Sequence, residues 1–325
     1  MRAAVNTRYG SPDVVRIVDV PQPVPAANEV VIKVYATTVN RTDCGELRAS
    51  PVFMRLFYGL CRPNRAIAGL DVAGKVESIG AGGQSFKTGE RVFGMCPYNR
   101  NGAHAEYVAV PESAVASMPA NLPYEQAVIC EGAFYANAVL MRINLKAGDR
   151  ILIYGASGAI GTSLLQLAKS AGARVTAVVS TQQLELVKSI GADRVVDYTC
   201  EDFTRIGEDF DFVVDAVGKT SFFRCRRLLK PTGTYAASDL GPWGQNVLLS
   251  MWSSITRRNR VVIPAPRRMS GFARLLKSRM ESGQFRAIID RKYALPAIAD
   301  AYRYVETGQK VGIVVITVAT TDESS

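Results

Sequence analysis

The chain has 325 residues, of which 48% are apolar and 21% are charged. This composition is typical of a water-soluble globular protein, and the length predicts two domains, because a domain usually has about 100–200 residues. No apolar run approaches the roughly 20 residues of a membrane-spanning helix, and the first residues do not resemble a secretory signal peptide. We therefore expect a cytoplasmic protein and not a membrane-spanning or secreted one.

The six cysteines are scattered along the chain and include no C-x-x-C pair. In a chain of this size, such a pattern favours reduced thiols over a disulfide framework. This agrees with an intracellular location.

Most of the net charge of +10 comes from one segment. Residues 257–292 contain eleven lysines and arginines against Glu281 and Asp290, which is a local excess of +9. A solvated helical face explains this excess, and so does a surface that contacts a nucleic acid or an anionic membrane. Both explanations stay open, because no recognition motif accompanies the charge.

The first 120 residues predict a small, mostly antiparallel β-domain. β-branched residues alternate or cluster at 29–39, 71–80, 89–95 and 104–110, and segments rich in proline and glycine separate these runs. The single histidine, His104, begins the last run. We expect it to be a surface or hydrogen-bonded histidine and not part of a catalytic triad.

From residue 122 the hydrophobic period becomes helical and then alternates between strand and helix. Strands are expected at 149–155, 174–180, 194–198, 210–218 and 233–239, and helices at 122–145, 159–172, 182–191 and 220–230. Strands that alternate with helices of this length indicate βαβ units and a parallel sheet. The tail adds two helices, at 271–284 and 294–308, and a last strand at 311–318.

Residues 154–161, YGASGAIG, follow a predicted strand and open a predicted helix. Gly158 and Gly161 occupy the second and third glycine positions of the G-x-G-x-x-G dinucleotide fingerprint, whereas Ala156 replaces the first and Gly155 precedes it. The unpaired N–H groups at the helix start would hold a pyrophosphate. The candidate residues for this role are Ser157, Gly158, Ala159, Ile160 and Gly161. A turn that only packs a strand against a helix is the alternative, but the flanking pattern favours a dinucleotide site.

The end of the next predicted strand indicates which dinucleotide binds. NAD sites usually have an Asp or Glu there, which accepts a hydrogen bond from the ribose 2′-hydroxyl. Here Ser180 and Thr181 follow the strand, and no acid occurs before Glu185. Because hydroxyls can donate to a 2′-phosphate and a carboxylate would repel it, we expect NADPH as the cofactor.

Several segments, taken in order, resemble the medium-chain dehydrogenase/reductase superfamily, in its zinc-free, zeta-crystallin-like quinone oxidoreductase branch. They include VNRTD (39–43), AGLDVAGKVESIGAG (68–82), FKTGERVFG (86–94), AHAEYVAVPE (103–112), LKAGDRILIYGASGAIGTSLLQLAKSAGARV (145–175), FDFVVDAVG (210–218) and AYRYVETGQKVGIVVI (301–316). Each segment is a loose match by itself, but their order and spacing are specific.

The resemblance implies an α/β protein with a GroES-like, β-rich catalytic domain and a Rossmann domain built on a doubly wound parallel sheet. The catalytic domain would comprise residues 1–121, completed by 265–325, and residues 122–264 would form the Rossmann domain. The active site would lie in the cleft between the two domains. The resemblance also implies a homodimer that pairs the edge strands at 260–265.

The resemblance also allows a test for zinc. Zinc-dependent members have a Cys, a His-Glu pair and a second Cys at the positions that Asn40, Leu70-Asp71 and Cys130 occupy here. One thiol and one carboxylate fall short of the three good ligands that a catalytic zinc needs. We therefore expect no metal.

The activity that the resemblance implies is hydride transfer from NADPH to a small hydrophobic quinone or α,β-unsaturated carbonyl, which needs no metal. It places Asn40 and Thr42 beside the nicotinamide and the acceptor as catalytic residues, with Asn40 also contacting the cofactor. An ordinary role in capping a turn is the alternative for each. Asp43 is expected to stabilise the loop.

In the Rossmann domain, the resemblance places Val217 and Gly218 over the nicotinamide and Tyr198 near the 2′-phosphate. Two positions depart from the family pattern: Leu184 stands where a Lys often faces the 2′-phosphate, and Phe134 stands where a small residue or Thr is usual. Either departure would weaken cofactor binding or turnover if the side chain faces the site.

Residues 48–65, RASPVFMRLFYGLCRPNR, form a longer and bulkier segment than in many relatives. Phe53, Phe57 and Tyr58 indicate a hydrophobic acceptor site, a lid or a packed core helix.

A second function from another class stays open. The chain would then be a weakly active or non-catalytic NADPH-binding protein, whose basic segment 257–292 contacts a nucleic acid or a membrane surface.

Overall fold

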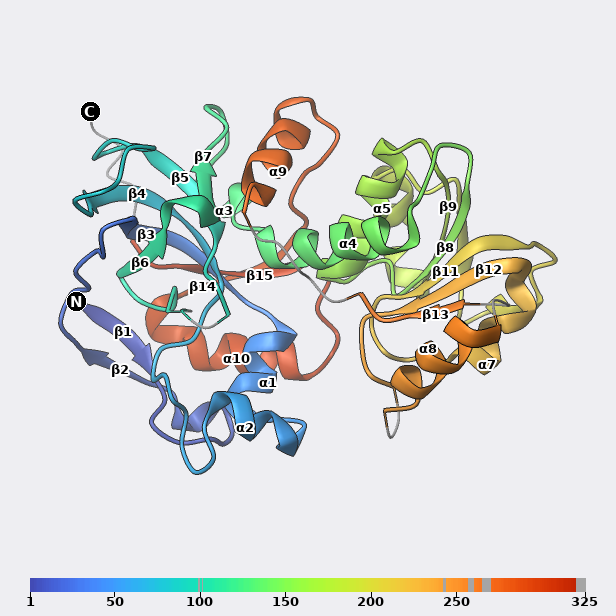
Figure 1. Ribbon diagram of the computed structural model, residues 1–325, viewed down its shortest axis with the longest axis horizontal. Coiled ribbons are helices and arrows are strands. Elements are labelled where there is room, and N and C mark those ends of the chain that lie inside the picture. The colour runs from blue at the N-terminus through green and yellow to red at the C-terminus, as the bar shows by residue number, and fades with distance from the viewer. Residues whose placement is uncertain (99, 101, 242–243, 257–259, 265–269, 320–325) are drawn as a thin grey trace. The chain divides into compact units, whose positions relative to one another are not determined.

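The computed structural model describes residues 1–98, 100, 102–241, 244–256, 260–264 and 270–319. Its contacts divide the chain into two compact units, one of Met1–Glu131 with Arg268–Ser325 and one of Gly132–Arg267. Figure 1 shows the elements of both units. The first unit keeps the short helix α3 (Tyr124–Ala127), which the sequence pattern assigns to the second domain.

The first unit is built on a seven-stranded sheet in the order β14-β15-β3-β4-β5-β7, with β6 also paired to β3. These strands are β3 (Glu29–Val39), β4 (Asp71–Ile79), β5 (Arg91–Met95), β6 (Tyr107–Pro111), β7 (Val115–Ser117), β14 (Ile289–Ala294) and β15 (Ile313–Thr317). A separate antiparallel pair is formed by β1 (Arg2–Val5) and β2 (Arg16–Asp19). Val314 of β15 lies opposite Val39 of β3, so the red C-terminal strand joins the blue N-terminal one (Figure 1). The two ends of the chain therefore share one domain.

The helices of the first unit are α1 (Arg41–Arg48), α2 (Arg55–Tyr58), α3, α9 (Phe272–Glu281) and α10 (Ile298–Glu306). Helix α10 shows why such a segment becomes helical: Ile298, Ala301, Tyr302 and Val305 recur at helical spacing and are all buried. They pack with apolar residues of α1 and β15, which include Leu47, in one core cluster. A second cluster of buried apolar side chains comes mainly from β3, β4 and β6.

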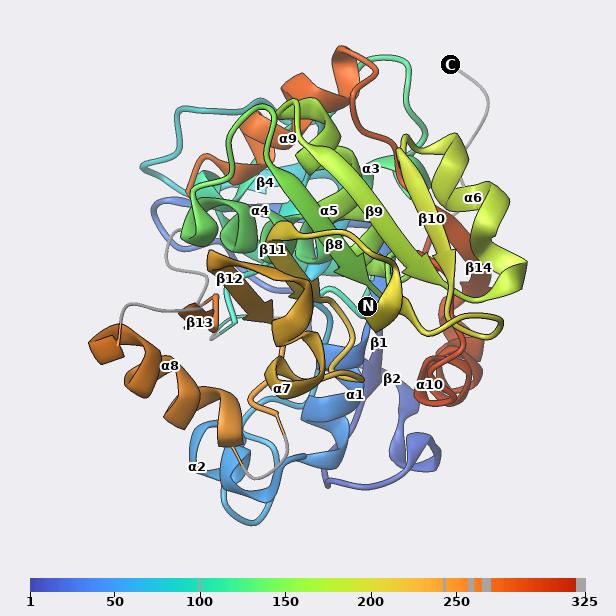
Figure 2. The ribbon, with the colours of Figure 1, turned by 90° about the vertical axis from the view of Figure 1, so that its right-hand side faces the viewer.

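The second unit has six strands, all parallel, in the order β10-β9-β8-β11-β12-β13. The strands are β8 (Arg150–Tyr154), β9 (Arg174–Val179), β10 (Arg194–Asp197), β11 (Phe210–Asp215), β12 (Leu229–Ala237) and β13 (Arg260–Val262). Numbered within the unit, this order is 3-2-1-4-5-6, which is the doubly wound Rossmann topology. Figure 2 shows β10, β9 and β8 side by side. The predicted fold class is therefore confirmed.

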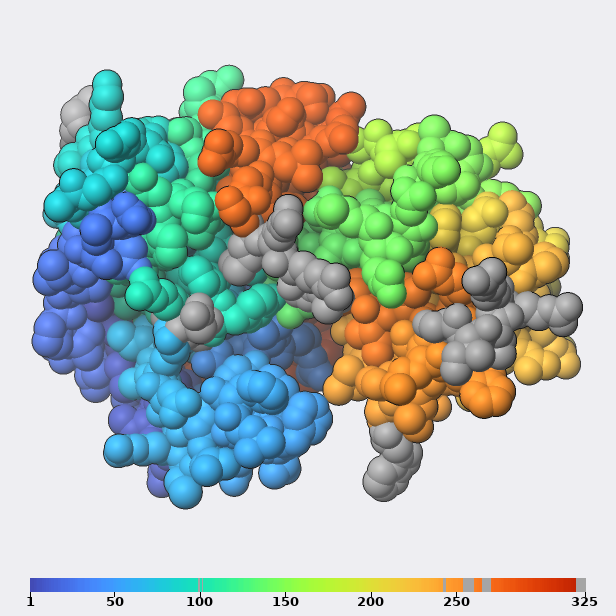
Figure 3. Space-filling model, in the orientation of Figure 1, coloured from blue at the N-terminus to red at the C-terminus, as the bar shows by residue number. Residues whose placement is uncertain are grey.

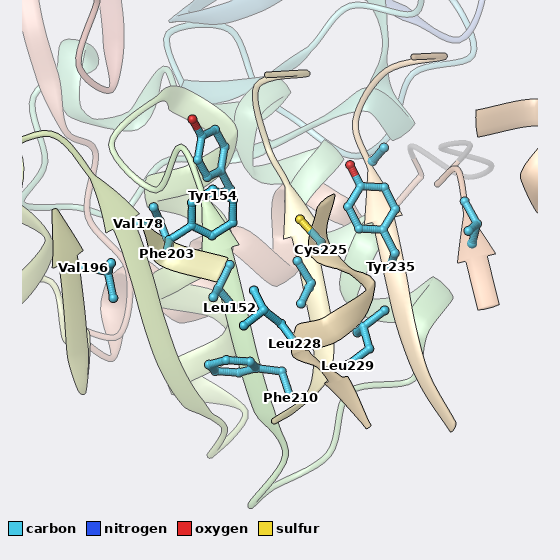
Figure 4. Close-up of a cluster of buried hydrophobic side chains, with 13 residues drawn as sticks. Leu152, Tyr154, Val178, Val196, Phe203, Phe210, Cys225, Leu228, Leu229 and Tyr235 are labelled. Carbon is cyan, nitrogen blue, oxygen red and sulfur yellow. The ribbon is translucent and has the colours of Figure 1, made fainter. Parts of the chain in front are cut away.

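The helices of the second unit are α4 (Cys130–Ile143, which begins in the first unit), α5 (Ala159–Ser170), α6 (Leu184–Ser189), α7 (Phe222–Cys225) and α8 (Gln245–Thr256). Apolar side chains of the sheet, such as Leu152 and Tyr235, pack with Cys225 and Leu228 from the α7 region (Figure 4). None of the helices in the described ranges is long and apolar enough to cross a membrane.

Two elements differ from the sequence prediction. The helix predicted at 122–145 is divided into α3 and α4. Strand β14 is not predicted, because Asp290, Arg291 and Lys292 interrupt its apolar pattern. As the edge strand of its sheet, β14 can keep these charges in contact with solvent.

Candidate functional site

The glycine-rich turn between β8 and α5 has the conformation that a phosphate-binding turn requires. Gly155 has a φ of +76°, in the left-handed region that favours glycine. Its N–H donates to the carbonyl of Val178 in β9, at 3.0 Å. A Cβ added to Gly155 would lie 2.6 Å from the side chain of Val217, so the loop after β11 packs directly on this turn.

Gly161 and Gly158 serve different purposes in the same turn. A Cβ on Gly161 would collide with the Gly155 carbonyl oxygen and the backbone of Ala156, so this glycine permits close packing of α5 on β8. A Cβ on Gly158 would have no atom nearer than 3.9 Å. Gly158 is the N-cap of α5, where no side chain of the described residues caps the helix and no acid occupies the first turn. The first N–H groups of α5 thus lie beside an open cradle.

Hydroxyl groups and one carboxylate meet at the end of β9. Ser180 donates a hydrogen bond to the side-chain oxygen of Gln183, and Thr181 donates to Asp197 at 2.6 Å. Thr199 also bonds Asp197, through its N–H and its hydroxyl. These hydrogen bonds, that of Thr181 first, lower the pKa of Asp197 to about 2, so its carboxylate is ionised at neutral pH. A negative charge at the end of β10 therefore lies beside the end of β9, which the local sequence does not predict.

The loop after β11 is organised by a buried carboxylate. Asp215 is fully buried, and its oxygens accept hydrogen bonds from the N–H groups of Val217 (3.0 Å), Gly218 (2.8 Å) and Thr220 (2.8 Å). Desolvation nevertheless raises the pKa of Asp215. Gly218 has a φ of +69°, while the side chain of Val217 is 41% exposed. Asp215 thus holds the two predicted cofactor residues in place.

In the first unit, a buried polar cluster lies where β3, β4 and the start of α4 meet. Asp71 is its centre: one oxygen accepts from the Thr38 hydroxyl at 2.9 Å and the other from the N–H of Glu131 at 2.7 Å. The amide of Asn40 donates to Thr38 at 2.9 Å. Asp43, which was expected to stabilise this loop, accepts from the N–H of Asn40 at 2.7 Å at the start of α1, where Asn40 is the N-cap. Buried Oδ1 of Asn40 has no hydrogen-bond partner in the described part of the chain.

Burial changes the protonation of this cluster. Desolvation raises the pKa of Asp43, Asp71 and Glu131 above the usual carboxyl range, and their mutual repulsion adds to the effect on the two aspartates. The Thr42 hydroxyl bonds the carboxylate of Glu131. Desolvation lowers the pKa of Lys310 to about 8 against the attraction of Glu131. Burial therefore favours the uncharged forms of these carboxyl groups and of Lys310.

His104 is a buried, hydrogen-bonded histidine, which confirms one of the two alternatives expected for it. Its Nε2 donates to the carbonyl of Thr38 at 2.8 Å, and Nδ1 accepts from the hydroxyl of Tyr302 at 3.3 Å. Desolvation lowers its pKa to about 4, so the ring is neutral at pH 7. It supports the strand end from which Asn40 projects.

Comparisons with known proteins agree with this geometry. The family model described as "Alcohol dehydrogenase GroES-like domain" matches residues 26–120, and the model described as "Zinc-binding dehydrogenase" matches residues 190–316. A 2-methylene-furan-3-one reductase of Solanum lycopersicum is 32% identical over 333 residues, which cover 97% of this chain and 79% of the relative. The chain belongs to the medium-chain dehydrogenase/reductase superfamily.

Other members of this oxidoreductase superfamily resemble the chain over nearly its whole length. A chloroplastic quinone-oxidoreductase homolog of Spinacia oleracea is 29% identical and matches 97% of this chain and 98% of its own. The solved structure of the quinone oxidoreductase from Coxiella burnetii superposes with a TM-score of 0.86 at 25% identity, covering 98% of this chain and 99% of the other. The predicted family is thus confirmed.

The zinc that some superfamily members bind does not fit the residues present. Both oxygens of Asp71 already accept hydrogen bonds, and Leu70 offers no donor atom. Burial raises the pKa of the Cys130 thiol well above its usual range, which opposes the thiolate that zinc requires. No group of three His, Cys, Asp or Glu side chains suited to a metal occurs among the residues that the structure describes.

The structure brings some predicted residues together and leaves others apart. Ser157, Gly158, Ala159, Ile160 and Gly161, the predicted phosphate-binding residues, follow one another from the turn after β8 into the start of α5. Tyr198 is 48% exposed, and its ring centre lies 6.0 Å from that of Tyr154 at the end of β8. Phe134 is buried, and Leu184 begins α6. The reasoning from sequence missed Asp197 and Asp215; Asp215 was detectable as an acid between a strand and a glycine turn.

The basic segment 257–292 has partners for several of its charges. Lys292 pairs with Glu125 at 3.1 Å and Lys277 with Glu281 at 3.7 Å, while the Arg291 guanidinium lies 3.9 Å from the centre of the Tyr304 ring. Residues 257–259 and 265–269 lie outside the described residues. A contact with nucleic acid or membrane through this segment stays a prediction.

Proposed function

We propose that the chain is an NADPH-dependent oxidoreductase that transfers hydride to a quinone or an α,β-unsaturated carbonyl acceptor without zinc. The observation that carries the proposal is the open cradle at Gly158, beside the uncapped start of α5. Backbone N–H groups and the positive end of a helix dipole suit a pyrophosphate. The residues present therefore fit a dinucleotide, which Gly158, Ala159, Ile160 and Gly161 would hold.

NADPH is favoured over NADH by two observations. A relative in Arabidopsis thaliana, 29% identical, is named an NADPH-dependent alkenal/one oxidoreductase. Ser180 and Thr181, and no acid, follow β9, where NAD sites usually have a carboxylate. Asp197 opposes this preference because its charge lies against Thr181. We therefore propose that Ser180 and Tyr198 contribute more to 2′-phosphate binding than Thr181 does.

We infer the class of acceptor from the names of the relatives and from the chemical group that their named acceptors share. The names of the relatives include a 2-methylene-furan-3-one reductase, an alkenal/one oxidoreductase and a quinone-oxidoreductase homolog. All of these acceptors contain a carbonyl conjugated to a carbon–carbon double bond. When bound, NADPH supplies a hydride, and conjugation spreads the resulting negative charge onto the carbonyl oxygen. Such an acceptor needs no metal to be reduced.

We assign Asn40 and Thr42 to the reacting end of the cofactor and acceptor, as the resemblance implies. Thr38 and Asp71 hold the amide NH2 of Asn40, and its Oδ1 faces the start of α1, which Asn40 caps. The side chain is therefore fixed in place. The Thr42 hydroxyl is half-buried and bonds Glu131, whose raised pKa keeps a proton in reach of that hydroxyl. The pair is thereby suited to deliver the proton that the enolate or hydroquinone anion takes up after hydride addition.

The test is NADPH oxidation with phenanthrenequinone and a small enone as acceptors. We expect turnover by the wild-type chain, and a loss of about tenfold or more in kcat/KM for Asn40→Ala, because Asn40 is assigned to the reacting end of the cofactor and acceptor. Asn137→Ala is the matched control, because this amide lies on α4 and donates to Met141. It should keep wild-type activity.

The enzymatic proposal fails if NADPH binds but no acceptor is reduced. That result would instead favour the non-catalytic NADPH-binding protein. A homodimer through β13 and a cytoplasmic location are further parts of the proposal.

A further inference from the structure

A segment of the first unit has its apolar side chains on the outside. It contains a short 3-10 turn, Val52–Met54, and helix α2. The exposed fractions are 72% for Val52, 48% for Phe53, 72% for Leu56, 70% for Phe57 and 66% for Leu60. We call these five residues the apolar stripe. The light-blue segment that contains them lies on the surface that Figure 3 shows.

The five residues come from the 3-10 turn, from α2 and from the residue after its end at Gly59, and all of them face outward. Positions 52, 56 and 60 are four residues apart, as 53 and 57 are, whereas Met54, Arg55 and Tyr58 are half-buried on the inner side. A helix that packs on its own protein turns its apolar face inward. The packed core helix that was one expectation for this segment is therefore excluded.

The segment is held to the fold. The Tyr9 hydroxyl donates to the carbonyl of Gly59 at 2.7 Å, and the Arg55 guanidinium lies 5.3 Å from the centre of the Tyr9 ring. The N–H of Asn64 donates to the carbonyl of Tyr58 at 2.7 Å. These contacts fix the segment that carries the stripe. Binding through the stripe therefore loses little conformational entropy.

The segment that carries the stripe has positive charges and no acid of its own. Between Leu47 and Leu70 the chain has four arginines and no acid. Arg62 and Arg65 are exposed, whereas Arg48 forms an ion pair with Glu306 at 2.5 Å. Neither Arg62 nor Arg65 forms an ion pair with the residues that the structure describes. Bulky apolar residues next to such arginines are the composition of an interfacial membrane contact.

We propose that the apolar stripe inserts into the headgroup region of an anionic lipid bilayer, with Arg62 and Arg65 against the lipid phosphates. A second copy of the chain fits less well, because a twofold contact would bring these arginines together and this segment supplies no acid to pair with them. The inference does not depend on the proposed oxidoreductase function, and it concerns a different surface from the basic segment 257–292.

The test is flotation of the full chain with lipid vesicles. We expect the wild-type chain to float with vesicles of phosphatidylcholine and phosphatidylglycerol, and to float less with phosphatidylcholine alone or at high salt. The double variant Phe53→Ser/Phe57→Ser should bind the vesicles more weakly by a factor of about ten or more. Arg62→Gln/Arg65→Gln should lose the preference for phosphatidylglycerol.

The matched control is Val24→Ser/Met141→Ser, which removes two exposed apolar side chains, 85% and 73% exposed, that lie outside both this segment and the basic segment 257–292. It should float as the wild-type chain does. The proposal is overturned if the wild-type chain does not float with anionic vesicles, or if the double phenylalanine variant floats equally well. It is also overturned if that variant instead converts an oligomer to a monomer while vesicle binding is absent.

Discussion

Asp197 shows how one residue can change the interpretation of a cofactor site. Its carboxylate lies beside Thr181, which follows β9, whereas Asp197 ends the neighbouring strand β10. The local sequence at Ser180 and Thr181 contains only hydroxyls, because Asp197 is 16 positions away along the chain. The pairing of β10 with β9 brings the charge there, and no local sequence pattern reveals it. Ser180, bonded to neutral Gln183, has no such conflict with a phosphate.

Two substitutions at this strand end should therefore act in opposite directions. Asp197→Asn removes a negative charge and should raise the affinity for NADPH several-fold relative to NADH. Ser180→Asp adds one and should weaken NADPH far more than NADH. Fluorescence titration with both nucleotides measures the ratio. Equal changes for NADPH and NADH in both variants would show that the 2′-phosphate binds elsewhere.

His104 predicts how the stability of the first unit depends on pH. Its pKa is about 4 in the folded chain against 6.5 when exposed, so the unfolded state binds the extra proton between these values. The stabilisation is complete above pH 6.5 and is lost as the pH falls to 4, by about 3 kcal/mol. Urea unfolding of the wild-type chain and His104→Gln over this range should show that the variant lacks this loss.

The His104→Gln variant is needed for comparison, because Asp43, Asp71 and Glu131 change the pH dependence of stability in the direction opposite to His104. Their raised pKa values make the folded state bind protons, so their contribution grows as the pH falls. Tyr302→Phe is the control, because His104 stays buried and neutral and the pH slope should match the wild type. An unchanged slope in His104→Gln would refute the assignment.

At the scale of the element, the strand-turn-helix from β8 to α5 was the most predictable part of the site. Its apolar strand, glycine spacing and amphipathic helix are all local signals. The long strands β3 and β4 were also predicted within a residue, since both alternate β-branched residues. Strand β14 was not, because it owes its conformation to pairing with β15 and not to its own charged sequence.

The two glycines of the turn should respond differently to the same substitution. Gly161→Ala forces a Cβ against Gly155 and Ala156 and should lower the free energy of unfolding by about 2 kcal/mol. Gly158→Ala meets open space at a φ of −77° and should cost less than about 1 kcal/mol. Thermal unfolding of both variants checks this order. A reversed order would mean that the helix does not pack on the strand as described.

At the scale of the whole molecule, the chain forms two units with cores of their own, and the first is closed by the C-terminal strand. β15 lies between β14 and β3, so it is a central strand of the sheet and all four of its residues from Ile313 to Ile316 are buried. This long-range pairing was implied by the family resemblance and not by any local pattern. The predicted homodimer concerns β13, an edge strand in the described sheet, and stays a prediction.

Removal of residues 313–325 should therefore unfold the first unit selectively. The deletion exposes both neighbours of β15 and opens the core around α10, whereas the parallel sheet of the second unit loses no strand. Hydrogen exchange should show loss of protection in β3 and β4 and retained protection in β8 and β9. Retained protection in β3 would contradict a central role for β15.

Calorimetric titration of the wild-type chain and Gly158→Ala with NADPH and NADH tests the account most directly. The account predicts that the wild-type chain binds NADPH more tightly than NADH. The Gly158→Ala variant should remain folded. It should bind both nucleotides more weakly by a factor of about ten or more, because the added Cβ occupies the cradle. A wild-type chain that binds neither nucleotide, or a variant that binds NADPH as tightly as the wild type, would contradict it.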